Sequence, residues 1–120
     1  LEKFHRMKFD VATPSSQLTT TVTKGYGKQV GKSGPVLDLR SWEAWLASGH
    51  VCNELASGRF RTVRPEERLR LLSPRELLRL HGYPDSFTFP EEVSHRQAMA
   101  LIGNSVTVPL VARLLGELLP

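Results

Sequence analysis

Two complete helix-start signals near the C-terminus constrain the fold of this chain more than any other feature. Ser73-Pro74-Arg75-Glu76 offers a serine N-cap, a proline in the first turn and a glutamate that can close a capping box. Ser94 and Gln97 repeat the cap and its partner at the same spacing. Gly82 and Gly103 each follow an apolar stretch and are typical of helix ends. We therefore expect helices over 73–82 and 94–102.

The segment after Gly103 predicts a third helix over 105–119. Its apolar residues have helical spacing and are expected to form a buried side, which comprises Val106, Val108, Val111, Leu114, Leu115 and Leu118. Gly103-Asn104-Ser105 would then stand at a helix start, with Ser105 as a possible cap. Free N–H groups and the positive end of the helix dipole favour an anionic or strongly polar ligand there.

The N-terminal half predicts short strands and loops. Residues 1–10 suit a helix end or a lead-in, and residues 11–17 suit a loop. The β-branched run 18–23 predicts a strand, and 36–39 predicts a strand or the lead-in to a helix. Ser41 is a candidate N-cap for a helix whose packed face holds Trp42, Trp45 and Leu46. Arginines alternate with other residues over 59–64, as in a strand with one charged face.

Positive charge is concentrated in the first half of the chain. Residues 1–65 contain ten Lys and Arg against five Asp and Glu, whereas residues 66–120 contain six against seven. A basic surface attracts the phosphate backbone of nucleic acids, although this charge is also common for solubility. The candidate nucleic-acid contacts are Lys24, Tyr26, Lys28, Lys32, Arg59, Arg61 and Arg64. Lysines beside an aromatic ring suit such a contact, and a glycine-rich turn with solvated lysines is the alternative.

The ordered motifs of the chain resemble those of the cytosine-5 methyltransferases. Residues 68–85, with SPREL and GYP, resemble motif IX, and residues 96–115, with GNSV, resemble motif X. The stretches TKGYG at 23–27 and GPVL at 34–37 resemble the recognition segment of the transfer-RNA branch. The resemblance implies an α+β part of an α/β, Rossmann-like, S-adenosylmethionine-dependent methyltransferase, in which short strands and loops precede three helices.

The resemblance also implies roles for the two halves of the chain. Residues 1–65 would form a target-recognition segment for tRNA or DNA, and residues 66–120 would pack on a cofactor domain. Asn104, Ser105 and Val106 would line the S-adenosylmethionine site. The transfer-RNA branch usually has Cys-Phe-Thr where this chain has Thr21-Val22-Thr23. The choice between RNA and DNA therefore stays open.

The catalytic residues of the resembled family have no counterpart in these 120 residues. In that family a cysteine thiolate in a Pro-Cys loop attacks carbon 6 of cytosine, and a glutamate in a Glu-Asn-Val segment acts at the ring nitrogen. Cys52, the single cysteine, follows Val51 and is expected to be structural. The family's glycine-rich cofactor loop is also missing. We therefore expect no catalytic residue, and no methyl transfer by this chain alone.

The residues leave three interpretations of the function of this chain open. The chain is the C-terminal part of a methyltransferase whose catalytic half is a separate polypeptide, a non-catalytic nucleic-acid-binding or scaffold module, or a degenerate product. Its first residue is leucine, which is compatible with a fragment or a processed chain.

Cysteine, histidine and hydropathy patterns set the remaining expectations. The four histidines and one cysteine show no metal-ligand spacing, so no metal site is expected. His81 is expected to cap a helix C-terminus. A single cysteine allows no internal disulfide, and no uninterrupted apolar run reaches the length of a membrane span. We expect an intracellular protein of the cytoplasm or nucleus, without a membrane partner.

Overall fold

The sheet that organises the first half of the chain has four short strands. The computed structural model describes residues 8–29, 32–47, 60–62 and 67–120. Its strands are β1 (Lys8–Ala12), β2 (Val36–Asp38), β3 (Phe60–Thr62) and β4 (Leu69–Arg70), in the order β3-β1-β2-β4. β1 and β2 are parallel, with Val11 opposite Val36, and the two outer strands are antiparallel to their neighbours. The side chains of β1 after Lys8 are buried, which places this strand inside the domain.

Several expectations for the first half are wrong. Residues 8–12 form a strand, not a helix end or a loop. Residues 18–23 form no strand, and Asp10 holds this segment by accepting hydrogen bonds from the backbone N–H and hydroxyl of Thr20. The helix α1 (Leu39–Ala47) begins two residues before Ser41. Asp38 accepts bonds from the Arg40 N–H and the Ser41 hydroxyl, so the aspartate organises this start.

Three expectations for this half are confirmed. The strand predicted over 59–64 is present as β3, over Phe60–Thr62. The segment 36–39 is both a strand end and the lead-in to α1. The Trp42 side chain is partly buried against the main core, as expected of a packed face. Leu46 departs from that expectation, because it is 62% exposed.

The helices α2 (Pro74–Leu80) and α3 (His95–Gly103) form as their start signals predict. In each helix the N-cap serine accepts a hydrogen bond from the N3 backbone, and the N3 side chain accepts one from the cap backbone. His81 is the C-cap of α2, as expected, and Gly82 follows with φ 79°. A Cβ on Gly82 would also lie 2.7 Å from Pro109 Cγ. Both the positive φ and the close approach of Pro109 therefore favour glycine at this position.

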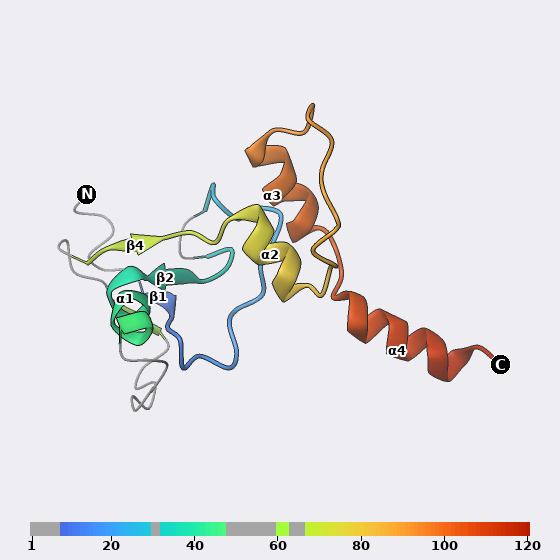
Figure 1. Cartoon of the computed structure of the whole chain (residues 1–120), viewed down its shortest axis with the longest axis horizontal. Helices are drawn as coiled ribbons and strands as arrows, with labels where there is room; N and C mark the ends of the chain where they lie inside the picture. Colours follow the sequence, from blue (N-terminus) through green and yellow to red (C-terminus); the bar gives the residue numbers. More distant parts are fainter. Residues whose placement is uncertain (1–7, 30–31, 48–59, 63–66) are drawn as a thin grey trace.

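One hydrophobic core joins the two halves of the chain. The buried residues are Ala12, Val22, Tyr26, Leu37, Leu72, Leu77, Leu78, Met99 and Ile102. They come from the sheet, from the segment that follows β1, and from α2 and α3. Figure 1 shows α2 and α3 beside each other at one end of the sheet, with α1 on the other side. The recognition segment expected from the sequence thus packs directly on the motif IX and X helices.

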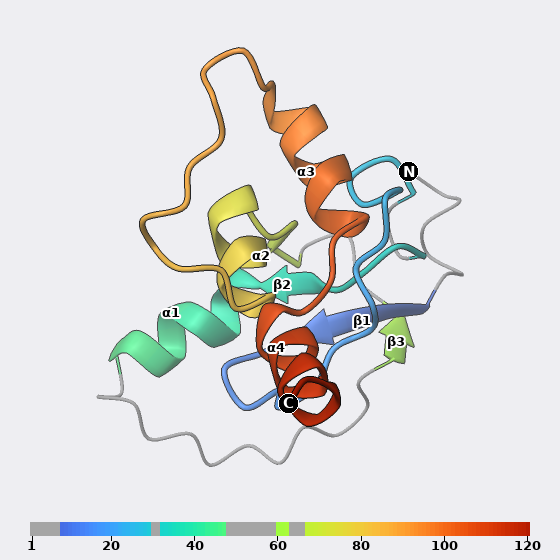
Figure 2. The same cartoon turned by 90° about the vertical axis from the view of Figure 1, so that its right-hand side faces the viewer.

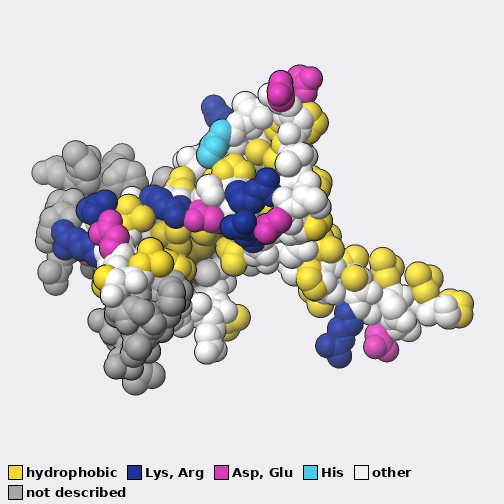
Figure 3. Space-filling view, viewed as in Figure 1, with side chains coloured by type: hydrophobic (Ala, Val, Ile, Leu, Met, Phe, Trp, Pro, Cys, Tyr) yellow, Lys and Arg dark blue, Asp and Glu magenta, His cyan; other side chains and the backbone are white. Residues whose placement is uncertain are grey.

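The helix α4 (Val108–Leu118) projects away from this core (Figures 1 and 2). Its first turn is attached by a 2.8 Å hydrogen bond from the Val108 N–H to the His81 carbonyl. Beyond that corner no residue of α4 is buried, and Leu118 is 78% exposed. The expected buried side of this helix is therefore wrong for the chain as it stands. Figure 3 shows the apolar side chains as a row along one face of α4.

The segment His95–Leu118 is long and apolar enough to cross a membrane by length and composition, contrary to the expectation from uninterrupted runs. It is divided between α3 and α4 by the residues around Asn104 and Thr107, which are not helical. Two short helices with a bend between them do not provide the continuous span that a bilayer requires.

Candidate functional site

The segment Thr23–Gln29 forms a tight and well-supported turn. The Tyr26 N–H donates to the Thr23 carbonyl, and the N–H groups of Lys28 and Gln29 both donate to the Gly25 carbonyl, at 2.9–3.0 Å. Gly27 adopts φ 88°, a conformation that other residues seldom reach. The Thr23 N–H donates to the carbonyl of the buried Ser33, which attaches the turn to the next segment. The conformation of this turn thus explains why TKGYG contains glycines.

Tyr26 is a structural anchor of this turn and not an exposed stacking platform. Its side chain is 4% exposed, and its hydroxyl donates to the Pro35 carbonyl at 2.6 Å. The same oxygen accepts the backbone N–H of Leu72 at 2.9 Å. Burial raises the pKa of Tyr26, so the hydroxyl keeps its proton at neutral pH. The buried ring therefore does not provide the exposed stacking surface that the sequence suggested.

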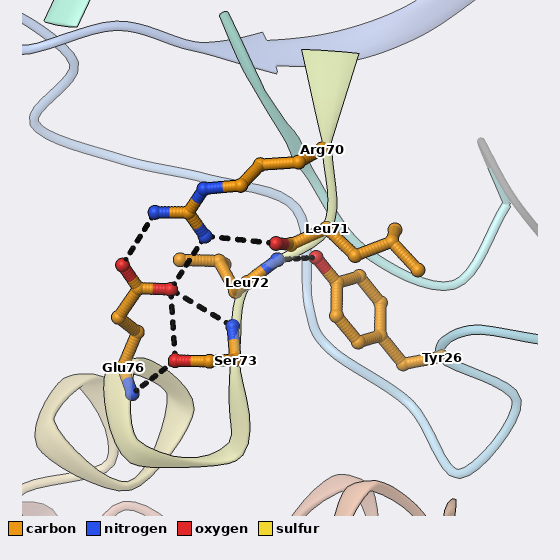
Figure 4. Close-up of polar contacts among 6 residues, drawn as sticks. All are labelled: Tyr26, Arg70, Leu71, Leu72, Ser73 and Glu76. Carbon is orange, nitrogen blue, oxygen red and sulfur yellow. Dashed lines mark hydrogen bonds and ion pairs between the residues drawn. The ribbon is translucent and has the colours of Figure 1, made fainter. Parts of the chain in front are cut away.

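A hydrogen-bond network connects this anchor to the start of α2 (Figure 4). Arg70 binds both carboxylate oxygens of Glu76, at 2.7 and 2.8 Å, and also donates to the Leu71 carbonyl. Glu76 accepts from the N–H and hydroxyl of Ser73. The Arg70 guanidinium, helped by Ser73, lowers the pKa of Glu76 to about 2. The capping box was predicted, but Arg70 was missed because its six-residue separation from Glu76 fits no helical pair.

Gly103 joins the turn to the end of α3. A Cβ on Gly103 would overlap the Thr23 carbonyl and lie 2.6 Å from the Lys24 nitrogen. Only glycine therefore allows the peptide between Thr23 and Lys24 to lie against the helix. The lysine of TKGYG and the GNSV motif, about eighty residues apart in the chain, meet at this contact.

The GNSV residues lie at the C-terminal end of α3, not at the start of the next helix. Asn104 is the C-cap of α3, and the Ser105 hydroxyl donates to the Ile102 carbonyl at 2.7 Å. Thr107 is the N-cap of α4 and makes no side-chain cap bond. The predicted anion site at a helix N-terminus and the predicted cap by Ser105 are therefore wrong. The physical reason is Pro109, which suits a first turn and starts the helix later.

The same geometry leaves polar and apolar groups of this motif available to a ligand. The Asn104 side chain is exposed, and within the described part of the chain it forms no hydrogen bond. The Ser105 oxygen can still accept a bond, and Val106 is 58% exposed. Asn104 can thus offer a donor and an acceptor, next to an apolar surface. Together they fit a ligand with a zwitterionic end and a less polar remainder.

The other predicted basic contacts have mixed outcomes. Lys24, Lys28 and Lys32 are exposed, as a nucleic-acid contact requires, and none forms an ion pair within the described ranges. Arg61 lies in β3 opposite Phe9, and only its backbone is described. Arg59 and Arg64, together with Cys52, lie outside the described residues. Their roles stay predictions.

No group of three or more His, Cys, Asp or Glu gathers to hold a metal ion among the residues that the structure describes. Three exposed ion pairs occur there instead, and each joins an arginine to a carboxylate: Arg68 to Glu43, Arg70 to Glu76, and Arg79 to Asp85. Figure 3 shows such alternating charges over β4 and α2. Each of these arginines is thus neutralised by its carboxylate, whereas the lysines of the turn have no such partner within the described ranges.

Comparison with known proteins places these features in a family. The sequence profile of the C-5 cytosine-specific DNA methylases matches residues 4–119. A DNA (cytosine-5)-methyltransferase of Dictyostelium discoideum is 32% identical over 91% of this chain, and the match covers 26% of that protein. A tRNA (cytosine(38)-C(5))-methyltransferase of Mus musculus is 31% identical over 92% of this chain and 27% of its own length.

Solved structures agree with the sequence comparison. The crystal structure of a Spodoptera frugiperda DNMT2 mutant superposes with a TM-score of 0.68 at 27% identity, over 93% of this chain and 34% of that one. The structure of the Entamoeba histolytica methyltransferase EhMeth gives a TM-score of 0.65 at 22% identity, which supports the fold alone. The fold-class prediction, short strands and then helices of a Rossmann-like methyltransferase, is confirmed.

The chain spans between about a quarter and a third of the length of the relatives and structures it matches. The matched part runs through the turn at Thr23–Gln29, the start of α2 and the GNSV motif. Because the profile match covers almost every residue, this chain belongs to the C-5 cytosine-specific DNA methylase family.

Proposed function

We propose that this chain supplies nucleic-acid recognition and one wall of the cofactor site to a cytosine-5 methyltransferase that acts on tRNA or DNA. The observation that carries the proposal is the contact between Gly103 and the Thr23–Lys24 peptide. It brings an exposed lysine of the turn and the available amide of Asn104 to the same end of α3. A protein that transfers a methyl group to a nucleic acid needs both surfaces close to each other.

Asn104, Ser105 and Val106 are the residues that would hold S-adenosylmethionine in this proposal. The cofactor, when bound, supplies the methyl group. Asn104 would orient the zwitterionic methionine end through its amide, and Val106 would contact a less polar part. The finding that supports this assignment is that the Asn104 side chain forms no bond within the described part of the chain.

The exposed face of α4 supports a partner polypeptide that carries the catalytic half. Leu110, Leu114 and Leu118 are each more than half exposed, on a helix whose first turn is hydrogen-bonded to the His81 carbonyl. An uncovered row of leucines is costly in water and stabilising once buried. The partner would bring the Pro-Cys and Glu-Asn-Val segments, which these 120 residues lack. An intracellular location, cytoplasm or nucleus, is part of the same proposal.

Reconstitution tests the role of α4. The chain is mixed with the catalytic segment of a tRNA methyltransferase relative, and complex formation is followed by analytical ultracentrifugation. Leu114→Asp should weaken the complex strongly, and Glu117→Lys, a charge change elsewhere on the same helix, should not. Equal affinity for both variants would contradict the proposed interface.

Cofactor titration of the assembled complex tests the role of Asn104. Asn104→Ala should weaken S-adenosylmethionine binding by roughly 0.5–3 kcal/mol, the range for a hydrogen bond to a polar or charged group. Thermal stability should change little. Unchanged affinity with a lower melting temperature would instead show that Asn104 only caps α3.

A further inference from the structure

A hollow of about 680 Å³ lies where the turn at Thr23–Gln29 meets α3. Lys28 and Gly27 come from the turn, His95 and Arg96 from the first turn of α3, and Arg70 from β4. The remaining wall is formed by Tyr26, Leu71, Leu72, Ser73 and Met99. We refer to this hollow as the Lys28–Arg96 pocket. The sequence motifs do not point to it, because they assign His95 and Arg96 no role.

The charge of this pocket is positive and largely uncompensated. Among the described residues no carboxylate lines it, and Arg70 is already bound through both its terminal nitrogens by Glu76. Lys28, His95 and Arg96 are exposed, and none of them forms an ion pair within the described ranges. Two full charges and an imidazole thus line one hollow without a counterion from the described part of the chain. Such an arrangement costs repulsion unless an anion occupies it.

The backbones that carry these cations are held in place. Lys28 follows the hydrogen-bonded turn whose Tyr26 hydroxyl accepts the Leu72 N–H on the opposite wall. Arg96 belongs to the first turn of α3, which the capping box of Ser94 and Gln97 fixes. The pocket is therefore preorganised, and binding does not require its two walls to be brought together.

We propose that the Lys28–Arg96 pocket binds the phosphodiester backbone of the nucleic-acid substrate. The proposal rests on the proposed function and extends its contact surface from the turn to the start of α3. A chain of phosphates suits the pocket better than a single phosphate. The hollow is much larger than one phosphate group, and its cations are exposed side chains, not a buried cluster of donors. Exposed cations on separate elements bind consecutive phosphates by counterion release.

Salt-dependent binding of the full 120-residue chain to tRNA and to duplex DNA tests this proposal by fluorescence anisotropy. Arg96→Gln should weaken binding roughly tenfold, as expected for one lost charged contact. It should also reduce the slope of log affinity against log salt by about one. Lys28→Gln should behave similarly. Arg113→Gln, an exposed cation on α4 outside the pocket, should change neither quantity.

The outcomes separate failure of the pocket from failure of the proposed function. Strong wild-type binding with an unchanged affinity and salt slope for Arg96→Gln would overturn the pocket and leave the recognition role intact. No wild-type binding to either nucleic acid would overturn both. Binding of polyglutamate, but not RNA, that depends on Arg96 would overturn the proposal in favour of an acidic protein partner. Equal thermal unfolding of wild type and variants verifies that the fold is unchanged.

Discussion

Replacing Tyr26 by phenylalanine removes one oxygen and keeps the aromatic ring. That oxygen donates to Pro35 and accepts from Leu72, and all three residues are buried. The substitution therefore leaves a buried carbonyl and a buried N–H without their partner. An unsatisfied buried polar group costs about 1–3 kcal/mol, so for two such groups we expect a loss of about 2–6 kcal/mol. This is a large part of the 5–15 kcal/mol typical of a small domain.

Urea unfolding followed by circular dichroism measures this loss, and RNA binding at a temperature where both proteins are folded provides the second reading. A structural anchor predicts lower stability with nearly unchanged RNA affinity, because the lysines of the turn remain. If Tyr26 instead stacks on a base, Tyr26→Phe should change neither stability nor RNA affinity. Tyr26→Ala should then weaken RNA binding without unfolding the protein. That second pattern would refute the anchor.

Three further predictions follow from the same contacts. Gly103→Ala should destabilise the chain by about 1–3 kcal/mol, because the added Cβ is overpacked against Thr23. Gly116→Ala is the control, because a Cβ there meets nothing within 4 Å and should be neutral or stabilising. Equal melting temperatures of the two variants would contradict the close contact at Gly103. The ion pair of Glu76 should be at full strength above pH 4.5 and be lost as the pH falls toward 2, since the pKa is lowered to about 2. With a third of this side chain exposed, screening limits the effect to about 1–2 kcal/mol; an acid unfolding curve that is the same for wild type and Glu76→Gln would argue against it. Replacing Lys24 and Lys28 by glutamate should weaken RNA binding and flatten its salt dependence. Unchanged RNA affinity would contradict the proposal that the turn contacts RNA.

The parts of the fold that local chemistry determines could be predicted from the sequence. The capping boxes of Ser73 and Ser94 each involve four consecutive residues, and both α2 and α3 begin where those residues indicate. The glycine turn at residue 82 is equally local. The strand β1 was missed because its partners are Val36 and the segment 60–62, which are far away in the chain.

The predictions for the site show the same limit. The spacing of aromatic and basic residues suggested an exposed Tyr26, but its environment is set by Pro35 and Leu72, which no local pattern identifies. Helical periodicity identified the apolar face of α4 and could not say what covers it. Arg96 was not among the predicted contacts, because the hollow that it shares with Lys28 joins residues far apart in the chain.

Methyl transfer by the chain alone, and by the chain with a family catalytic segment, tests the central claim most directly. Labelled S-adenosylmethionine is incubated with tRNA or DNA, and the label in cytosine is measured. The proposed role predicts no transfer by the chain alone, none by the catalytic segment alone, and transfer by the mixture that falls in Asn104→Ala and Arg96→Gln. Labelled cytosine produced by the isolated chain, and persisting in Cys52→Ala, would contradict the account.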